Sequence, residues 1–92
     1  MSDYNTVATI RVMPEGVETD LEALKTKIQD AVPGNMKIHK IEEEPIAFGL
    51  VALNVMILTS DKEGGDLDPA VEAFDTLENV SEVDITDVRR LL

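Results

Sequence analysis

The sequence predicts a single α+β domain in which strands and helices follow one another in the order β-α-β-β-α-β. Two segments carry apolar residues at the three- and four-residue spacing of amphipathic helices, and four others show the alternating or continuous apolar pattern of strands. In chain order these six segments are residues 6–13, 19–31, 36–41, 50–58, 68–77 and 80–88. A chain of 92 residues has room for one hydrophobic core, so we expect one domain over residues 1–92.

The first strand and helix are marked by a change of period. Residues 6–13 read T-V-A-T-I-R-V-M, which alternates with the period of two that is typical of a strand. Thr19 and Glu22 have the spacing of a capping box, so we expect Thr19 to be the N-cap of the helix. The apolar stripe of this helix consists of Leu21, Leu24, Ile28 and Ala31. Pro33 and Gly34 are expected to end it.

The next two strands differ in their predicted surroundings. Residues 36–41 alternate apolar with charged side chains, which indicates an edge strand, where charges discourage stray pairing. Residues 42–45, E-E-E-P, are expected to form a connector, because proline cannot donate to a strand ladder. Residues 50–58 are nearly all apolar, as expected of a central strand that is covered on both faces.

The last helix and strand follow a polar loop at residues 60–67. Asp68 and Pro69 predict a helix start, with Asp68 as the N-cap and Pro69 in the first turn. The apolar stripe of this helix consists of Val71, Phe74 and Leu77. Asn79 is expected to end the helix. The apolar residues assigned to the last strand are Val80, Val83, Ile85 and Val88.

This element order predicts how the layers are arranged. Right-handed crossovers place both helices on one face of a four-stranded antiparallel sheet, which is the ferredoxin-like sandwich. This fold hosts many unrelated functions, so the function has to be argued from individual residues.

The charge balance narrows the classes of partner. The net charge of -11, with a pI near 4.2, would repel phosphate backbones, so we expect no direct nucleic-acid binding. The most apolar stretch, residues 47–58, is too short to span a bilayer as a helix, and the first residues lack the features of a secretory signal. We therefore expect no membrane contact and a cytoplasmic location.

The residues that commonly carry catalysis are sparse. The absence of cysteine excludes disulfides, thiolate metal sites and a cysteine nucleophile. His39, the only histidine, lies in the predicted edge strand without a nucleophile signature beside it. The acidic residues of the loop, Asp61, Glu63, Asp66 and Asp68, lack the spacing of an EF-hand. We expect no catalytic residue, no metal and no cofactor; a hydrolase built on His39 or paired carboxylates is a weaker alternative.

An RNA-recognition role on this sheet would need aromatic side chains on the exposed sheet face, with basic residues beside them. The only aromatic residues are Tyr4, Phe48 and Phe74, and Phe74 belongs to a helix stripe. The strand segments lack the aromatic-basic motif, which argues against RNA recognition.

Two features are not explained by packing. Phe48 lies between Ala47 and Gly49, just after the predicted connector. A bulky aromatic there is either the first core residue of the next strand or an exposed anchor for a partner, and the sequence leaves both open.

The second feature is the ending Arg89-Arg90-Leu91-Leu92, which places two cations after a strongly acidic half of the chain. These arginines either balance the charge or form a short positive probe that a partner recognises.

At these two places the chain resembles a known family. Residues 44–50, E-P-I-A-F-G-L, the two-glycine acidic loop before Asp68, and the ending V-R-R-L at residues 88–91 resemble archaeal elongation factor 1-beta. The resemblance covers essentially the whole chain, and the P-I-A-F-G-L segment is its most specific part.

The resemblance implies a protein that binds the GTPase elongation factor 1-alpha and promotes the replacement of GDP by GTP. The GTPase is thereby returned to the form that delivers aminoacyl-tRNA. In the eukaryotic relatives an aromatic residue in a Gly-aromatic-Gly segment docks on the GTPase. This role carries over to Phe48, flanked by Ala47 and Gly49.

The resemblance also assigns a role to the C-terminus. In the eukaryotic relatives a lysine beside the C-terminal leucine reaches toward the magnesium site of the GTPase. This role carries over to Arg90, which lies between Arg89 and Leu91. Arg90 replaces lysine and Ala47 replaces the first glycine, and arginine is a poorer mimic of a compact ion.

These features give two hypotheses about function. An exchange factor would be monomeric when free and would need no cofactor. The alternative is a small-ligand-binding regulatory domain on the same fold, which the element order alone suggests.

Overall fold

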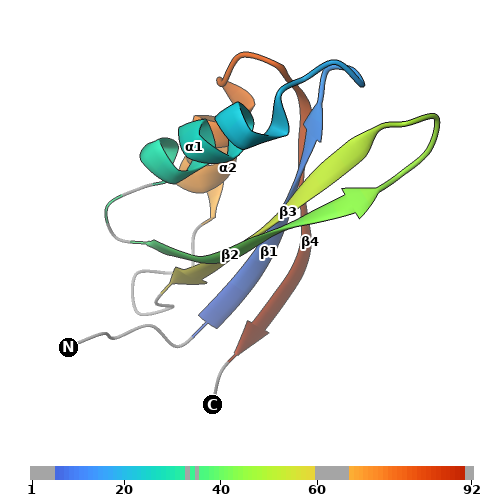
Figure 1. The fold of residues 1–92 in the computed structure, drawn as a ribbon. Helices are drawn as coiled ribbons and strands as arrows, with labels where there is room; N and C mark the ends of the chain where they lie inside the picture. The colour runs from blue at the N-terminus through green and yellow to red at the C-terminus, as the bar shows by residue number, and fades with distance from the viewer. Residues whose placement is uncertain (1–5, 33, 35, 60–66, 91–92) are drawn as a thin grey trace.

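The computed structural model describes residues 6–32, 34, 36–59 and 67–90, and within these ranges the side chains of Asp68 and Arg90 are not described. Its elements follow the predicted order β-α-β-β-α-β (Figure 1). They are β1 (Thr6–Pro14), α1 (Leu21–Ala31), β2 (Lys37–Pro45), β3 (Val51–Thr59), α2 (Asp68–Asp75) and β4 (Val80–Arg90). The polar loop predicted for residues 60–67 lies outside the described residues except for Leu67.

The four strands form one antiparallel sheet in the order β2-β3-β1-β4, and both helices lie on the same face of it (Figure 1). The predicted α+β sandwich is therefore confirmed. β2 is an edge strand and β3 a central strand, as their charge patterns predict. β4 forms the other edge.

The face of the sheet that carries the helices holds the hydrophobic core. Alternate residues of β1 and β3 point toward α1 and α2, and the largest core side chain, Phe74 of α2, is fully buried. The core consists of Ala8, Ile10, Val12, Leu24, Ile28, Met36, Leu53, Val55, Ile57, Leu67, Ala70 and Phe74. One face of β1 is buried and the other is not, and this explains why its apolar residues alternate with a period of two.

The opposite side of the sheet, which we call the open face, has no helix against it (Figure 1). Strand pairing aligns its residues in four rows, since directly opposite residues share a face. In the order β2, β3, β1, β4, the first three rows are Lys37-Leu58-Val7-Arg89, Lys40-Met56-Thr9-Asp87 and Glu42-Asn54-Arg11-Asp84. The fourth row consists of two separate pairs, Glu44-Ala52 and Met13-Glu82. The first row lies at the end of the sheet where β4 ends, and the fourth lies toward the β2–β3 turn.

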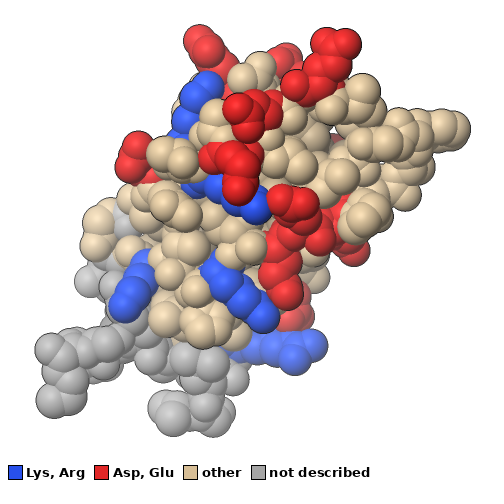
Figure 2. Space-filling view, viewed as in Figure 1, with Lys and Arg blue, Asp and Glu red and all other residues tan. Residues whose placement is uncertain are grey.

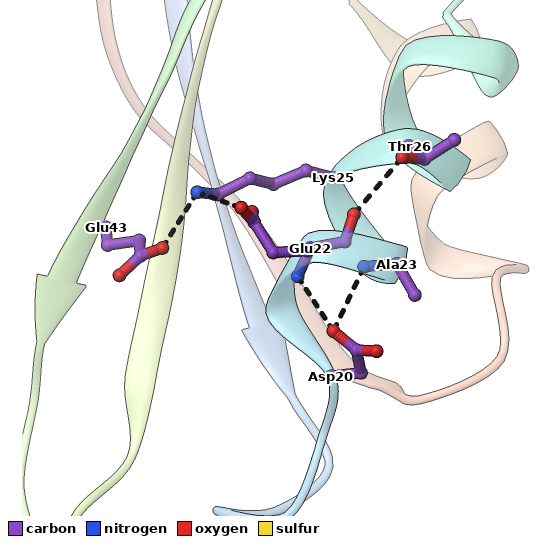
Figure 3. A network of polar contacts seen from close by, with 6 residues as sticks. All are labelled: Asp20, Glu22, Ala23, Lys25, Thr26 and Glu43. Atoms are coloured by element: carbon purple, nitrogen blue, oxygen red, sulfur yellow. Dashed lines mark hydrogen bonds and ion pairs between the residues drawn. The ribbon is translucent and has the colours of Figure 1, made fainter.

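Both predicted helix caps are wrong by one residue. The N-cap of α1 is Asp20, whose Oδ1 accepts hydrogen bonds from the backbone N–H groups of Glu22 at 3.1 Å and Ala23 at 3.2 Å (Figure 3). Thr19 lies outside the helix, and its N–H donates to the carbonyl of Gly16 in the preceding turn. One carboxylate can accept from two N–H groups, which explains why Asp20 takes the position.

The second helix begins at Asp68, so its N-cap is Leu67 and not Asp68. Leu67 makes no side-chain cap bond but is only 6% exposed and belongs to the core. Burial of Leu67 thus fixes where α2 starts, and Pro69 lies in the first turn as predicted. The helix ends at Asp75, and Asn79 lies instead in the turn before β4, with φ at 71°.

The predicted connector at residues 42–45 is wrong, because these residues continue β2 and pair with Asn54 to Val51 of β3. Pro45 is tolerated because it is the last residue of an edge strand, where the missing N–H costs few hydrogen bonds between strands. The two strands therefore form a long hairpin whose turn begins only after Pro45.

Candidate functional site

The turn between β2 and β3 presents Phe48 to solvent. The side chain of Phe48 is 98% exposed, and it is the most exposed large apolar residue among those the structure describes. Of the two possibilities that the sequence leaves open for Phe48, the structure supports the exposed one. A fully exposed phenylalanine has no packing role inside the chain.

The backbone of this turn holds Phe48 in an unusual conformation. The N–H of Ile46 donates to the carbonyl of Leu50, and the N–H of Leu50 donates to the carbonyl of Ala47, both at 2.9 Å. Phe48 and Gly49, the two central residues, have φ values of 55° and 83°. Two consecutive positive φ values are typical of the type I′ turn that joins antiparallel strands. Asparagine or glycine is usual at the first of these positions, and phenylalanine is strained there.

Two further apolar side chains accompany Phe48 at this end of the molecule. Ile46, in the same turn, is 43% exposed, and Val17, in the loop between β1 and α1, is 61% exposed. A Cβ built on Gly49 would lie 3.3 Å from Cγ1 of Val17, so the two loops are in close contact. We call Val17, Ile46 and Phe48 the apolar tip.

Val17 was not among the predicted site residues. The sequence does give one sign of it: Val17 is the only apolar side chain in the polar segment E-G-V-E, and it belongs to no apolar stripe of the neighbouring strand or helix.

The two C-terminal arginines lie at the other end of the sheet. Arg89 and Arg90 are the last residues of β4 and pair with Val7 and Thr6 of β1. Both arginines are held in the sheet by β1, and the probe role of their side chains stays a prediction. Leu91 lies outside the described residues.

Arg89 is exposed and makes an ion pair with its neighbour on the same strand. Its Nε lies 2.7 Å from Oδ2 of Asp87, and its side chain is 76% exposed. An exposed pair of this kind contributes only about 0.2–1 kcal/mol, so the guanidinium can exchange Asp87 for another anion at little cost.

The structure separates the two predicted contact regions. The apolar tip lies just before the start of β3, whereas Arg90 pairs with Thr6, the residue that also pairs with Thr59 at the end of β3. β3 is nine residues long, and a strand rises about 3.3 Å per residue, so the two regions are about 30 Å apart. A single partner that contacts both would have to span the whole sheet.

The described part of the chain contains no cluster of three or more metal-ligating side chains. His39 is exposed at a bulge in edge strand β2, as expected of a surface histidine. Of the predicted acidic loop, Asp61, Glu63 and Asp66 lie outside the described residues.

The described residues line two open grooves with the volume of a small-ligand site. One of about 530 Å³ lies between α1 and β2, with Lys25, Met36 and Lys40 among its lining residues. The other, of about 500 Å³, follows the loop at residues 15–19. Both are open to solvent, and ligand pockets more often enclose most of a ligand's surface.

Comparison with known proteins gives the class of this chain. Residues 7–91 match the EF-1 guanine nucleotide exchange domain, so the match runs through every helix and strand. The chain is thus a guanine nucleotide exchange factor of translation elongation.

The particular family follows from its relatives. Elongation factor 1-beta of Methanothermobacter thermautotrophicus is 57% identical over 86 residues, which cover 94% of this chain and 96% of that protein. Elongation factor 1-beta of Thermococcus gammatolerans is 46% identical over 91 residues, which cover 99% of this chain and all of that protein. The chain belongs to the elongation factor 1-beta family, as its resemblance to that family implies.

A solved structure supports the fold alone. The C-terminal domain of the MgtC protein from Mycobacterium tuberculosis superimposes with a TM-score of 0.60 at 14% identity, over 98% of this chain and 92% of that one. At this identity the likeness carries no functional argument. Neither helix in the described ranges is long and apolar enough to cross a membrane.

Proposed function

We propose that this chain promotes the exchange of GDP for GTP on the GTPase elongation factor 1-alpha, and that Phe48 is its docking anchor. The observation that carries this proposal is the strained, 98% exposed Phe48 at the tip of the β2–β3 turn. Backbone strain and an exposed aromatic are both unfavourable in the isolated chain, and such features cluster at functional sites. Aromatic side chains are also the usual anchors of protein interfaces.

The second contact belongs to the opposite end of the sheet. Arg89 and Arg90 would approach the nucleotide site of the GTPase, where magnesium neutralises the phosphates. A cation placed there disturbs the magnesium coordination and so weakens the binding of GDP. Ala47 and Gly49 would support docking by shaping the turn, and Leu91 would continue the contact beyond Arg90.

Exchange then follows from linkage. A protein that weakens nucleotide binding to the GTPase must itself bind the nucleotide-free GTPase more tightly, by the same factor. The chain needs no acid, base or cofactor of its own for this role, because the free energy of binding to the nucleotide-free GTPase favours release of GDP. We further propose that it is a monomer when free and that it acts in the cytoplasm, where translation takes place.

The test is a GDP-release assay with the cognate elongation factor 1-alpha, loaded with a fluorescent GDP. The unaltered chain should accelerate release, and Phe48→Ala should raise the half-saturating concentration about thirtyfold, as expected when an anchor worth about 2 kcal/mol is truncated. Ile85→Ala is the matched control, because Ile85 is also an exposed apolar residue but lies on β4. An unaltered chain that leaves the release rate unchanged at every concentration would refute the proposal.

The C-terminal role is tested separately by the double substitution Arg89→Ala with Arg90→Ala. It should lower the maximal release rate while leaving the half-saturating concentration nearly unchanged, because docking and exchange depend on different ends of the sheet. A substitution is a cleaner test than truncation, since Arg90 pairs with Thr6 in the sheet. If the half-saturating concentration rises instead, these arginines serve docking and not exchange.

No observation favours the small-ligand alternative, since the described grooves are open to solvent.

A further inference from the structure

The open face of the sheet carries few charges at its centre. The two central strands, β1 and β3, place Val7, Met13, Met56 and Leu58 there, all of them half-buried. Arg11 is the only charged side chain that these two strands contribute to this face. In a chain with 29% charged residues, an uncovered and largely uncharged sheet centre is typical of a contact surface.

The sequence of β3 leads to the same conclusion. Its residues are apolar on both faces, which predicts a strand covered on both sides. The helices cover one side, where Leu53, Val55 and Ile57 are fully buried. On the open face Ala52 is also fully buried, whereas Met56 and Leu58 are half-buried. Met56 and Leu58, on the other side, have no layer against them among the described residues. The covering layer that the sequence of β3 predicts is therefore not supplied by α1 or α2.

Charges flank this apolar centre in a polarised arrangement. Toward the end of β4, the edge strands contribute Lys37, Lys40 and Arg89, and also Asp87, which forms an ion pair with Arg89. Toward the β2–β3 turn, they contribute Glu42, Glu44, Glu82 and Asp84. Figure 2 shows one side of the molecule, where acidic side chains cover much of the upper part and basic ones lie both there and near the lower end. A surface of this kind fixes the orientation of a charged partner.

The open face lies between the two proposed contacts with the GTPase, which are Phe48 and Arg89. Phe48 lies beyond the fourth row, and Arg89 lies in the first row. The rows between them cover the distance of about 30 Å that one partner would have to span.

We propose that the open face is itself a docking surface, on which the GTPase lies across the apolar centre from the apolar tip to Arg89. This inference rests on the proposed function and adds the surface and its chemistry. The GTPase would carry apolar side chains opposite Met56 and Leu58. It would carry acidic ones opposite Lys37 and Lys40, and basic ones opposite Glu42 and Glu44.

The first experiment measures the affinity of the chain for the nucleotide-free GTPase. Met56→Glu places a charge at the centre of the open face, and we expect it to weaken binding at least tenfold, by about the amount that one buried, unpaired charge costs. Gln29→Glu is the matched control, because it introduces the same charge on the exposed side of α1. It should bind as the unaltered chain does.

The outcomes separate this inference from the proposed function. If the unaltered chain does not bind the GTPase, the proposed function fails. If the unaltered chain binds and Phe48→Ala weakens binding but Met56→Glu does not, only the docking of the open face is overturned.

A second experiment needs no variant and so does not depend on Met56→Glu folding. Mild peroxide converts accessible methionines to sulfoxides. Met13 and Met56 lie on the open face, whereas Met36 is 5% exposed in the core and serves as the internal reference. Complex formation should slow oxidation of Met13 and Met56 several-fold and leave Met36 unchanged. Equal oxidation rates with and without the GTPase would overturn the inference.

The polarity is tested by the double substitution Lys37→Glu with Lys40→Glu. We expect a lower association rate at low salt, with a difference that shrinks as salt is added, because charge complementarity acts mainly on encounter. An unchanged association rate would show that the basic end does not face acidic groups of the GTPase.

Discussion

Phe48 combines two unfavourable features at the scale of a single residue. Its ring is 98% exposed, and its φ of 55° lies in the left-handed region, which costs an ordinary L-residue roughly 1–2 kcal/mol. Neither cost is recovered inside the isolated chain, because the ring makes no core contact. The proposed docking role would recover both, since binding buries the ring on the GTPase.

Substitution of Phe48 therefore separates stability from function. Phe48→Asn should raise the free energy of unfolding by about 1 kcal/mol, because asparagine tolerates positive φ, and should lower exchange activity strongly. Urea denaturation and the GDP-release assay measure the two quantities.

Phe48→Ala is the control, because alanine loses the ring but keeps the strain, so activity should fall without a gain in stability. A destabilised Phe48→Asn variant would contradict the view that the ring has no packing role.

Gly49 has a backbone reason to be glycine. Its φ is 83°, and a Cβ there would approach Val17 to 3.3 Å. Gly49→Ala should therefore lower the free energy of unfolding by about 1 kcal/mol and displace the neighbouring ring of Phe48. Exchange activity should fall together with stability, in contrast to Phe48→Asn. A Gly49→Ala variant as stable as the unaltered chain, by thermal denaturation, would contradict this account of the turn.

At the scale of elements, the start of α1 depends on one side chain. Asp20→Ala removes the acceptor of two backbone hydrogen bonds and should cost about 1 kcal/mol of stability. Thr19→Ala is the natural comparison, because the capping box pattern points to Thr19 while the structure places it outside the helix. It should cost little. Urea denaturation of both variants decides between them, and a larger loss for Thr19→Ala would contradict the assignment of the cap.

Lys25 joins α1 to the edge strand β2. Its Nζ lies 2.8 Å from Oε2 of Glu43 and 3.2 Å from Oε2 of Glu22 (Figure 3). The hydrogen bond to Glu43, and then that to Glu22, raise the pKa of Lys25 above its ordinary value of 10.5. Lys25 therefore stays charged in the folded chain at pH values where it would begin to lose its proton in the unfolded chain.

The raised pKa gives a pH dependence with a definite sign. The stabilisation by these ion pairs is complete below pH 10.5 and is lost as the pH rises through the folded-state pKa of Lys25. Unfolding free energies measured at about pH 9 and about pH 11.5 should thus fall more for the unaltered chain than for Lys25→Met. Equal losses in the two proteins would contradict the raised pKa. At neutral pH a double-mutant cycle with Glu43→Gln should give a coupling of only about 0.5 kcal/mol, because the pair is partly exposed.

At the scale of the whole molecule, the net charge of -11 opposes folding through self-repulsion. The ion pairs of the described residues are mostly exposed, and each contributes little. Sodium chloride should therefore raise the melting temperature between about 0.05 M and about 1 M, because screening weakens the repulsion more than it weakens these pairs.

A variant with fewer acidic residues gives the matched control for the effect of salt. Glu72→Gln with Asp75→Asn neutralises two exposed carboxylates of α2. This variant should melt at a higher temperature at low salt and should respond less to sodium chloride. An equal response in both proteins would attribute the effect of salt to something other than charge repulsion.

Local patterns determined much of this fold. The alternation in β1, the apolar stripe of α1 and the continuous apolar run of β3 each reflect burial of a particular face, so their element types could be predicted. The ends of elements were less predictable. Asp20 and Leu67 fix the helix starts through a carboxylate with two donors and through core burial, neither of which spacing alone reveals.

By itself, the sequence determined the order of the elements, the edge position of β2 and the resemblance on which the function rests, because these depend on residues near one another in the chain. Only the tertiary structure decided that residues 42–45 extend β2, that Phe48 is consequently turned out to solvent, and that Arg89 lies about 30 Å from it. It also decided that, among the described residues, both helices lie on one face of the central strands. These outcomes depend on how distant strands pair, and the free energy of that pairing is not contained in any local pattern.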